Sequence, residues 1–223
     1  MGNALQNSRR ALLPENIDSL ETKLKVESKM LHFKDKNNFS QSENVPTMGK
    51  NMPIVIGIVQ NLLAINQMND LKILEIMAGN CSASTMLEEK IRDNVKSWVR
   101  TDIGDYSRQS EQMDAVDAVA QYGDQSNLLL MICPPPGSID TENFVGSCYG
   151  DYFACKKFIA TKKGENKYII FVGELGASDG SDGMYLYMLT HTRLKLLGRK
   201  MIQKGLDNFG GPLEKEVFLF LIN

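Results

Sequence analysis

The feature that most constrains the fold is an alternation of short apolar segments with amphipathic ones from residue 71 onward. The segments LKILEI (71–76), NLLLMIC (127–133) and KYIIFVGE (167–174) are predominantly apolar. Between them, residues 84–94 and 150–162 repeat apolar side chains at helical spacing. Strands that are apolar on both faces and alternate with helices predict a parallel sheet covered by helices on both sides. The expected fold class is therefore α/β and doubly wound.

Weaker patterns supply the remaining elements. We expect a further strand over 97–103 and helices over 52–65, 111–123 and 181–193. Two closing strands are expected over 194–203 and 215–222. Gly123 is expected to end the helix over 111–123, and Ser181 or Asp182 to cap the helix over 181–193. In the helix over 84–94, Met86, Leu87 and Ile91 are expected to face inward. These segments supply six strands, and we expect a mostly parallel sheet of seven strands or a shortened one of six.

The first 50 residues differ in character from the rest of the chain. Residues 14–31 place Ile17, Leu20, Leu24 and Leu31 on one helical stripe, and a polar run follows. We therefore divide the chain into an amphipathic helix with a polar linker, residues 1–50, and one α/β domain, residues 51–223. The helix is expected to pack on its own domain, on a protein partner or on a second copy of the chain.

Composition excludes several function classes. The formal net charge of −2 gives no basic footprint for nucleic acid. No segment reaches the roughly 20 consecutive apolar residues of a membrane helix, and the first residues lack a secretory signal, so we expect a cytoplasmic protein. The four cysteines form no C-x-x-C pair and have no histidine at metal-ligand spacing, so no metal site is expected.

The candidate chemistry lies where the predicted strands end. Ligands of doubly wound sheets bind beyond the carboxyl ends of the strands, at the switch in strand order. Here the first strand carries Glu75 next to its end and is followed by the small-residue turn MAGNCSAS, and the second strand carries Asp102 next to its end. A turn of small residues lets the backbone approach a ligand closely, and a carboxylate at the next strand end can accept both hydroxyls of a ribose.

This arrangement resembles the class I S-adenosylmethionine-dependent methyltransferases. Their first motif reads acidic-x-Gly-x-Gly-x-Gly, and EIMAGNCSAS matches it at Glu75, Gly79 and Asn80, while Met77 and Cys81 depart from it. The two departures fit such a turn if their backbone stays at negative φ. The resemblance covers residues 52 to 223, and the ending FGGPLEKEVFLFLIN looks like the family's closing hairpin, whose last strand runs antiparallel.

The resemblance implies S-adenosylmethionine as the cofactor and assigns roles to single residues. Glu75 would fix the methionine amino group, Gly79 would leave room for the cofactor, and Asp102 would take the ribose hydroxyls. Asp114 with Ala115 would flank the adenine. The full set of implied cofactor-binding residues is Glu75, Met77, Gly79, Asn80, Cys81, Asp102, Ile103, Asp114 and Ala115.

The implied acceptor side includes Cys133, Pro134, Pro135 and Glu174. The stretch CPPPG stands where amino-methylating members carry Asp or Asn, then Pro-Pro and an aromatic residue. Because Cys133 is a poor hydrogen-bond acceptor, methylation of adenine N6 or glutamine is disfavoured. Glu174 is either a general base or a carboxylate that accepts backbone N–H groups of its own glycine-rich loop.

Two functions remain open from the sequence. The first is a methyltransferase of unknown acceptor, with a small molecule or a protein favoured over nucleic acid. The second is a catalytically inactive binding or regulatory module on the same scaffold, which the lost glycines and the unusual CPPPG stretch would suit.

Overall fold

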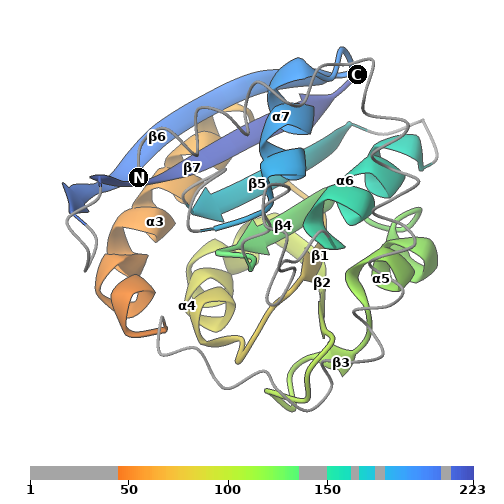
Figure 1. Cartoon of the computed structure of the whole chain (residues 1–223), viewed down its shortest axis with the longest axis horizontal. Coiled ribbons are helices and arrows are strands. Elements are labelled where there is room, and N and C mark those ends of the chain that lie inside the picture. Colours follow the sequence, from red (N-terminus) through yellow and green to blue (C-terminus); the bar gives the residue numbers. More distant parts are fainter. Residues whose placement is uncertain (1–44, 136–149, 162–165, 174–178, 207–211) are drawn as a thin grey trace, which may run out of the picture.

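The computed structural model describes residues 45–135, 150–161, 166–173, 179–206 and 212–223 (Figure 1). The predicted helix over 14–31, Glu174 and the third proline of CPPPG lie outside these ranges. Among the described residues, no helix combines the length and the hydrophobicity that crossing a membrane requires.

The elements follow one another in the order that the sequence predicts, with one added strand. The helices are α3 (Val45–Ile65), α4 (Ser82–Ile91), the 3-10 turn η2 (Arg92–Asn94), α5 (Ala115–Tyr122), α6 (Gly150–Ala160) and α7 (Asp182–Thr190). The strands are β1 (Leu71–Ile76), β2 (Val95–Asp102), β3 (Glu111–Gln112), β4 (Leu128–Ile132), β5 (Lys167–Gly173), β6 (Leu194–Leu206) and β7 (Pro212–Ile222).

The seven strands form one sheet in the order β3-β2-β1-β4-β5-β7-β6. The first five are parallel to one another, and β7 runs antiparallel to both β5 and β6. The predicted doubly wound α/β sheet is therefore confirmed in its seven-stranded form. Strand order reverses between β1 and β4, so the carboxyl ends of these two strands flank the position where such sheets bind ligands.

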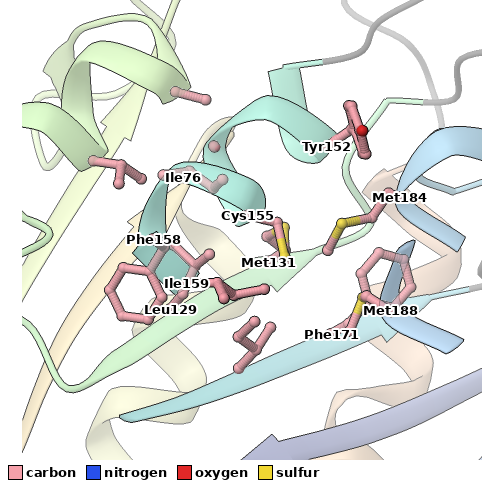
Figure 2. Close-up of a cluster of buried hydrophobic side chains, with 14 of the residues drawn as sticks. Ile76, Leu129, Met131, Tyr152, Cys155, Phe158, Ile159, Phe171, Met184 and Met188 are labelled. Atoms are coloured by element: carbon pink, nitrogen blue, oxygen red, sulfur yellow. The ribbon is translucent and has the colours of Figure 1, made fainter. Parts of the chain in front are cut away.

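Two hydrophobic cores, one on each face of the sheet, explain why the strands are apolar on both sides. Alternate strand residues such as Leu129 and Leu130 point to opposite faces. One core packs β-strand side chains against α5, α6 and α7, and the other packs them against α3 and α4. Figure 2 shows part of the first core, where Met131 and Phe171 meet side chains of α6 and α7 such as Phe158.

Three local predictions are corrected. The helix predicted over 111–123 begins only at Ala115, because Glu111 and Gln112 pair with β2 as the short edge strand β3. Met86 was expected to face inward but is 40% exposed, whereas Leu87 is buried under α4. The helix predicted over 52–65 begins earlier, at Val45, and ends at Ile65.

Candidate site at the carboxyl ends of β1, β2 and β4

The turn after β1 adopts left-handed backbone at three alternate positions. Met77, Gly79 and Cys81 have φ of 56°, 55° and 60°. These are the three glycine positions of the motif that the sequence resembles, so the backbone takes the glycine conformation although two glycines are replaced. The condition set by the sequence, negative φ at Met77 and Cys81, is not met. A left-handed residue with a Cβ costs about 1–2 kcal/mol, so the turn is strained.

Several hydrogen bonds hold this strained turn. The N–H of Ala78 donates to the carbonyl of Thr101 at 3.0 Å, and the N–H of Cys81 donates to the carbonyl of Ala78 at 3.0 Å. Cys81 is the N-cap residue of α4 but makes no side-chain cap. Instead, Asn80 Oδ1 accepts from the N–H and the hydroxyl of Ser82, at 3.1 and 2.8 Å. Asn80 therefore starts α4 in place of a conventional N-cap.

The space over the centre of this turn is open. A Cβ added at Gly79 would meet no heavy atom within 4 Å. Asn80, next to it, is exposed, whereas Cys81 is buried. A ligand can therefore approach the backbone at Gly79, with the N-terminus of α4 beside it.

Asp102 joins the turn to the end of β2. One carboxylate oxygen accepts the N–H of Gly79 at 2.8 Å, and the other accepts the N–H of Gly104 at 2.9 Å. Asp102 is 7% exposed. A carboxylate can accept about four hydrogen bonds, so these two contacts leave acceptor capacity on both oxygens. Asp102 and the Met77–Cys81 turn are therefore brought together, as the sequence predicts.

The start of α5 lies next to Asp102 through a backbone link. The N–H of Met113 donates to the carbonyl of Asp102 at 2.7 Å, which places Asp114 and Ala115 beside the end of β2. Asp114 is the N-cap of α5, and its side chain accepts from the N–H of Val116 at 2.8 Å. Ala115 is buried, whereas Ile103, which follows Asp102, is 39% exposed.

Glu75 occupies a different environment from Asp102. It is 2% exposed and lies on the face of β1 that α4 covers. Its Oε2 accepts a hydrogen bond from Trp98 Nε1 at 3.0 Å and lies 3.4 Å from Arg100 Nε. Burial raises the pKa of Glu75 from 4.5 to about 7, against the opposing effects of Ser84, Trp98 and Arg100. Its contact with a methionine amino group stays a prediction.

Sequence reasoning did not single out Arg100 or Trp98. In the register of β1 on β2, Glu75 lies directly opposite Arg100, and this alignment brings the two side chains together. Arg100, in a segment that the sequence predicts as a strand of a helix-covered sheet, was the available signal, because a buried charge requires a partner.

On the other side of the switch point, Cys133 follows β4 with a left-handed φ of 48°. Its N–H donates to the carbonyl of Val172 at 2.7 Å. Burial, and secondly the nearby Asp179 carboxylate, raise the pKa of the Cys133 thiol to about 12. The thiol is therefore protonated at neutral pH and is a poor nucleophile. Pro134 is buried and Pro135 is half-buried behind it.

A buried ion pair that the sequence did not predict lies beside Cys133. Lys215 Nζ is 2.9 Å from Asp179 Oδ2 and 3.9 Å from the Cys133 sulfur. Asp179 and Lys215 are 7% and 8% exposed. The N–H of Gly180 donates to the carbonyl of Pro134 at 2.8 Å, which fixes the turn that carries Asp179. Asp179 and Lys215 are far apart in the sequence, so no local sequence pattern predicts that they form an ion pair.

Metal ligands and thiols are the remaining reactive groups within the described ranges. No group of three or more His, Cys, Asp and Glu side chains there is placed to hold a metal ion. Cys81, Cys133 and Cys155 are free thiols.

Comparisons with known proteins give structural likeness only. A scan against models of protein families finds no match, and no curated protein matches the sequence. Among solved structures, the magnesium protoporphyrin IX methyltransferase ChlM from Synechocystis, crystallised with bound SAM, shares 10% identity at a TM-score of 0.48. The match covers 87% of this chain and 91% of ChlM.

Two further structures give similar values. The N-methyltransferase NodS from Bradyrhizobium japonicum has 10% identity and a TM-score of 0.48, with 78% of this chain and 97% of NodS covered. TrmN from Thermus thermophilus has 12% identity and a TM-score of 0.46, and the match covers 74% of this chain and 48% of TrmN. The fold assignment itself rests on the strand order of the sheet, and what this chain binds is argued from its own site.

Proposed function

We propose that the chain is an S-adenosylmethionine-dependent methyltransferase whose methyl donor binds across the carboxyl ends of β1, β2 and β4. The observation that carries the proposal is the Asp102 carboxylate, which is fixed by two backbone N–H groups beside the open space over Gly79. A buried acceptor of this kind at the end of the second strand suits the two hydroxyls of a ribose.

The other cofactor residues take places around this centre. Ile103 and the Asp114–Ala115 helix start lie next to Asp102 and would border the adenine. Gly79 and Asn80 would face the amino-acid part of the donor, with Met77 and Cys81 forming the rest of the turn. Glu75 would support that turn, or reach the donor's amino group as the sequence resemblance implies.

The chemistry supplied by the donor is an activated methyl group on a sulfonium. The protein then has mainly to hold this group in line with a nucleophile and exclude water, because positioning supplies much of the rate when the leaving group is already activated. Cys133, Pro134 and Pro135 stand at the end of β4, across the switch point from Gly79, and would line the acceptor side. Glu174 would act there as a base or as a support of its own loop.

The acceptor is proposed at the level of its class. The near-neutral net charge of −2 provides no phosphate-binding footprint, which favours a small molecule or a protein side chain over nucleic acid. The Cys133 thiol does not supply the carboxylate or amide acceptor of amino-methylating members, which disfavours adenine N6 and glutamine. A cytoplasmic location accords with such acceptors.

A second candidate is an inactive binding module on the same scaffold. The left-handed Met77 and Cys81 favour it, because each puts a side chain where a glycine would leave the turn unstrained. Such a module would contact a protein partner or a second copy of the chain. It predicts no affinity for the methyl donor.

Isothermal titration of the full chain with S-adenosylhomocysteine and S-adenosylmethionine separates the two functions. We expect binding, and at 100 times Kd a stabilisation of about 2.7 kcal/mol in thermal unfolding. Asp102→Ala should weaken binding at least about tenfold, since a hydrogen bond to a charged group contributes about 1.5–3 kcal/mol.

Two matched variants complete the test. Asp105→Ala changes an exposed aspartate in the same loop and should bind as the wild type does. Asp102→Asn keeps the size of the side chain but replaces one accepting oxygen with an NH2 donor, which would face the N–H of Gly79 or Gly104, so it should also weaken binding. Absence of binding at millimolar ligand, with the fold intact by circular dichroism, contradicts the methyltransferase and supports the module.

A further inference from the structure

A buried polar network runs beneath the donor turn and joins β1, β2 and α4. Arg100 is its centre: its Nε donates to Ser84 Oγ at 3.1 Å, and its Nη2 donates to Glu88 Oε2 at 2.7 Å. On the other side, Arg100 forms the ion pair with Glu75 and lies over the ring of Trp98, with its guanidinium carbon 4.8 Å from the ring centroid. The side chain of Arg100 is 9% exposed.

The network reaches the turn through the first turn of α4. The Ser84 hydroxyl, which accepts from Arg100, donates to the carbonyl of Cys81 at 3.2 Å. Thr85 adds two more bonds to the same carbonyl, from its N–H at 2.9 Å and from its hydroxyl at 2.8 Å. A continuous chain of contacts therefore runs from Glu75 through Arg100 and Ser84 to the left-handed Cys81.

We infer that Glu75 and Arg100 are positioning residues for the methyl donor. Arg100 holds the N-terminal turn of α4 against β1, and the charge of Glu75 determines how firmly Arg100 holds that turn. This inference rests on the proposed function. Neither residue needs to touch the donor. Both act through Ser84 and the backbone of Cys81.

The charge balance around Glu75 gives the direction of the effect. The titratable groups that face it are Arg100 from β2, Glu88 from α4 and the Cys81 thiol. Its β4 neighbour Leu130 and residues 51–65 of α3 carry no charge. With Glu75 ionised, two carboxylates hold Arg100. With Glu75 protonated, the remaining charged partner is the carboxylate of Glu88, whose side chain is 35% exposed, and the guanidinium is drawn toward the surface.

Donor affinity should therefore rise as Glu75 ionises. Burial places the pKa of Glu75 at about 7, so the change falls within an accessible pH range. We expect S-adenosylhomocysteine to bind about three- to tenfold more tightly at pH 8.5 than at pH 5.5, as linkage to one titrating group allows. Glu75→Gln should bind with a Kd that is independent of pH across this range.

Trp98 provides a second readout, because it is the single tryptophan of the chain and donates directly to Glu75. Without ligand, its fluorescence should titrate near pH 7 in the wild type and not in Glu75→Gln. A residue that served only general stability would not produce this paired signature.

The experiment is a calorimetric titration of the full chain with S-adenosylhomocysteine from pH 5.5 to 8.5. Arg100→Met should weaken binding several-fold, and Arg100→Lys, which keeps the charge but loses the fork to Ser84 and Glu88, should recover part of it. Glu89→Gln, an exposed change on α4, is the matched control and should leave the pH profile unchanged.

The outcomes separate this inference from the proposed function. Binding with a pH-independent Kd in the wild type, or an unchanged pH profile in Glu75→Gln, overturns the inference and leaves the methyltransferase standing. If Glu75→Gln does not fold, equal Kd values for Arg100→Met and wild type overturn it. No binding at any pH contradicts the proposed function and this inference together.

Discussion

The left-handed conformation of Met77 makes a sharp prediction about stability, because it reverses the usual ranking of alanine and glycine. At ordinary φ, glycine is less stable than alanine by about 0.5–1 kcal/mol, since it loses more backbone freedom on folding. At a φ of 56°, an alanine Cβ costs about 1–2 kcal/mol that glycine avoids. The balance favours glycine at residue 77 by about 0.5–1 kcal/mol.

The comparison is therefore between Met77→Gly and Met77→Ala rather than with the wild type. Met77 is partly buried and packs against the core under α5 and α6, so either change also removes side-chain packing. Taking alanine as the reference cancels most of that loss. For a chain of this length, we expect Met77→Gly to melt about 2 °C above Met77→Ala.

Urea or thermal unfolding of both variants is the assay, with Ala120→Gly as the control. Ala120 is exposed on α5, where glycine should lower the free energy of unfolding by about 1 kcal/mol. The two sites should thus show opposite signs. If Met77→Gly is instead less stable than Met77→Ala by a similar amount, the turn is not left-handed at this residue and our account of its strain fails.

Three further variants test the buried polar groups. Lys215→Met removes the buried cation that pairs with the Asp179 carboxylate and should cost about 3–5 kcal/mol in urea unfolding. Asp179→Leu should restore most of this loss in the double variant, and additive losses would argue against the pair. For Glu75, the folded-state pKa of about 7 lies above the unfolded value of 4.5, so its stabilisation is complete below pH 4.5 and is lost as pH rises through 7. The wild type should lose roughly 3 kcal/mol over this range and Glu75→Gln should not, which pH-dependent denaturation would reveal. Ser181→Ala removes the hydroxyl that caps α7 and should lower the free energy of unfolding by about 1 kcal/mol, and an unchanged value would show that the cap contributes nothing.

The sheet was predictable from the sequence because its strands are buried on both faces. Leu128–Ile132 and Lys167–Gly173 are flanked on each side by helices, and burial on both faces leaves a nearly continuous apolar run. By contrast, Glu111 and Gln112 form an exposed two-residue edge strand, which cannot be predicted from a hydrophobic pattern.

The site was predictable where it depends on strand ends and not where it depends on register. Asp102 is the last residue of β2, so its place at the carboxyl edge of the sheet could be inferred. The pairing of Glu75 with Arg100 needs the alignment of two strands, and that of Asp179 with Lys215 needs the antiparallel return of β7. The positive φ of Met77 could not be inferred, because the hydrogen bonds around the turn impose it against the preference of the side chain.

The central claim is that one nucleoside-bearing ligand bridges the ends of β1 and β2. Hydrogen exchange of the full chain, measured with and without saturating S-adenosylhomocysteine, tests it at the amides concerned. We predict slower exchange in residues 77–81, 102–104 and 113–116 together, with little change in α3. Unchanged exchange in all three segments, or slowing confined to another part of the sheet, would contradict it.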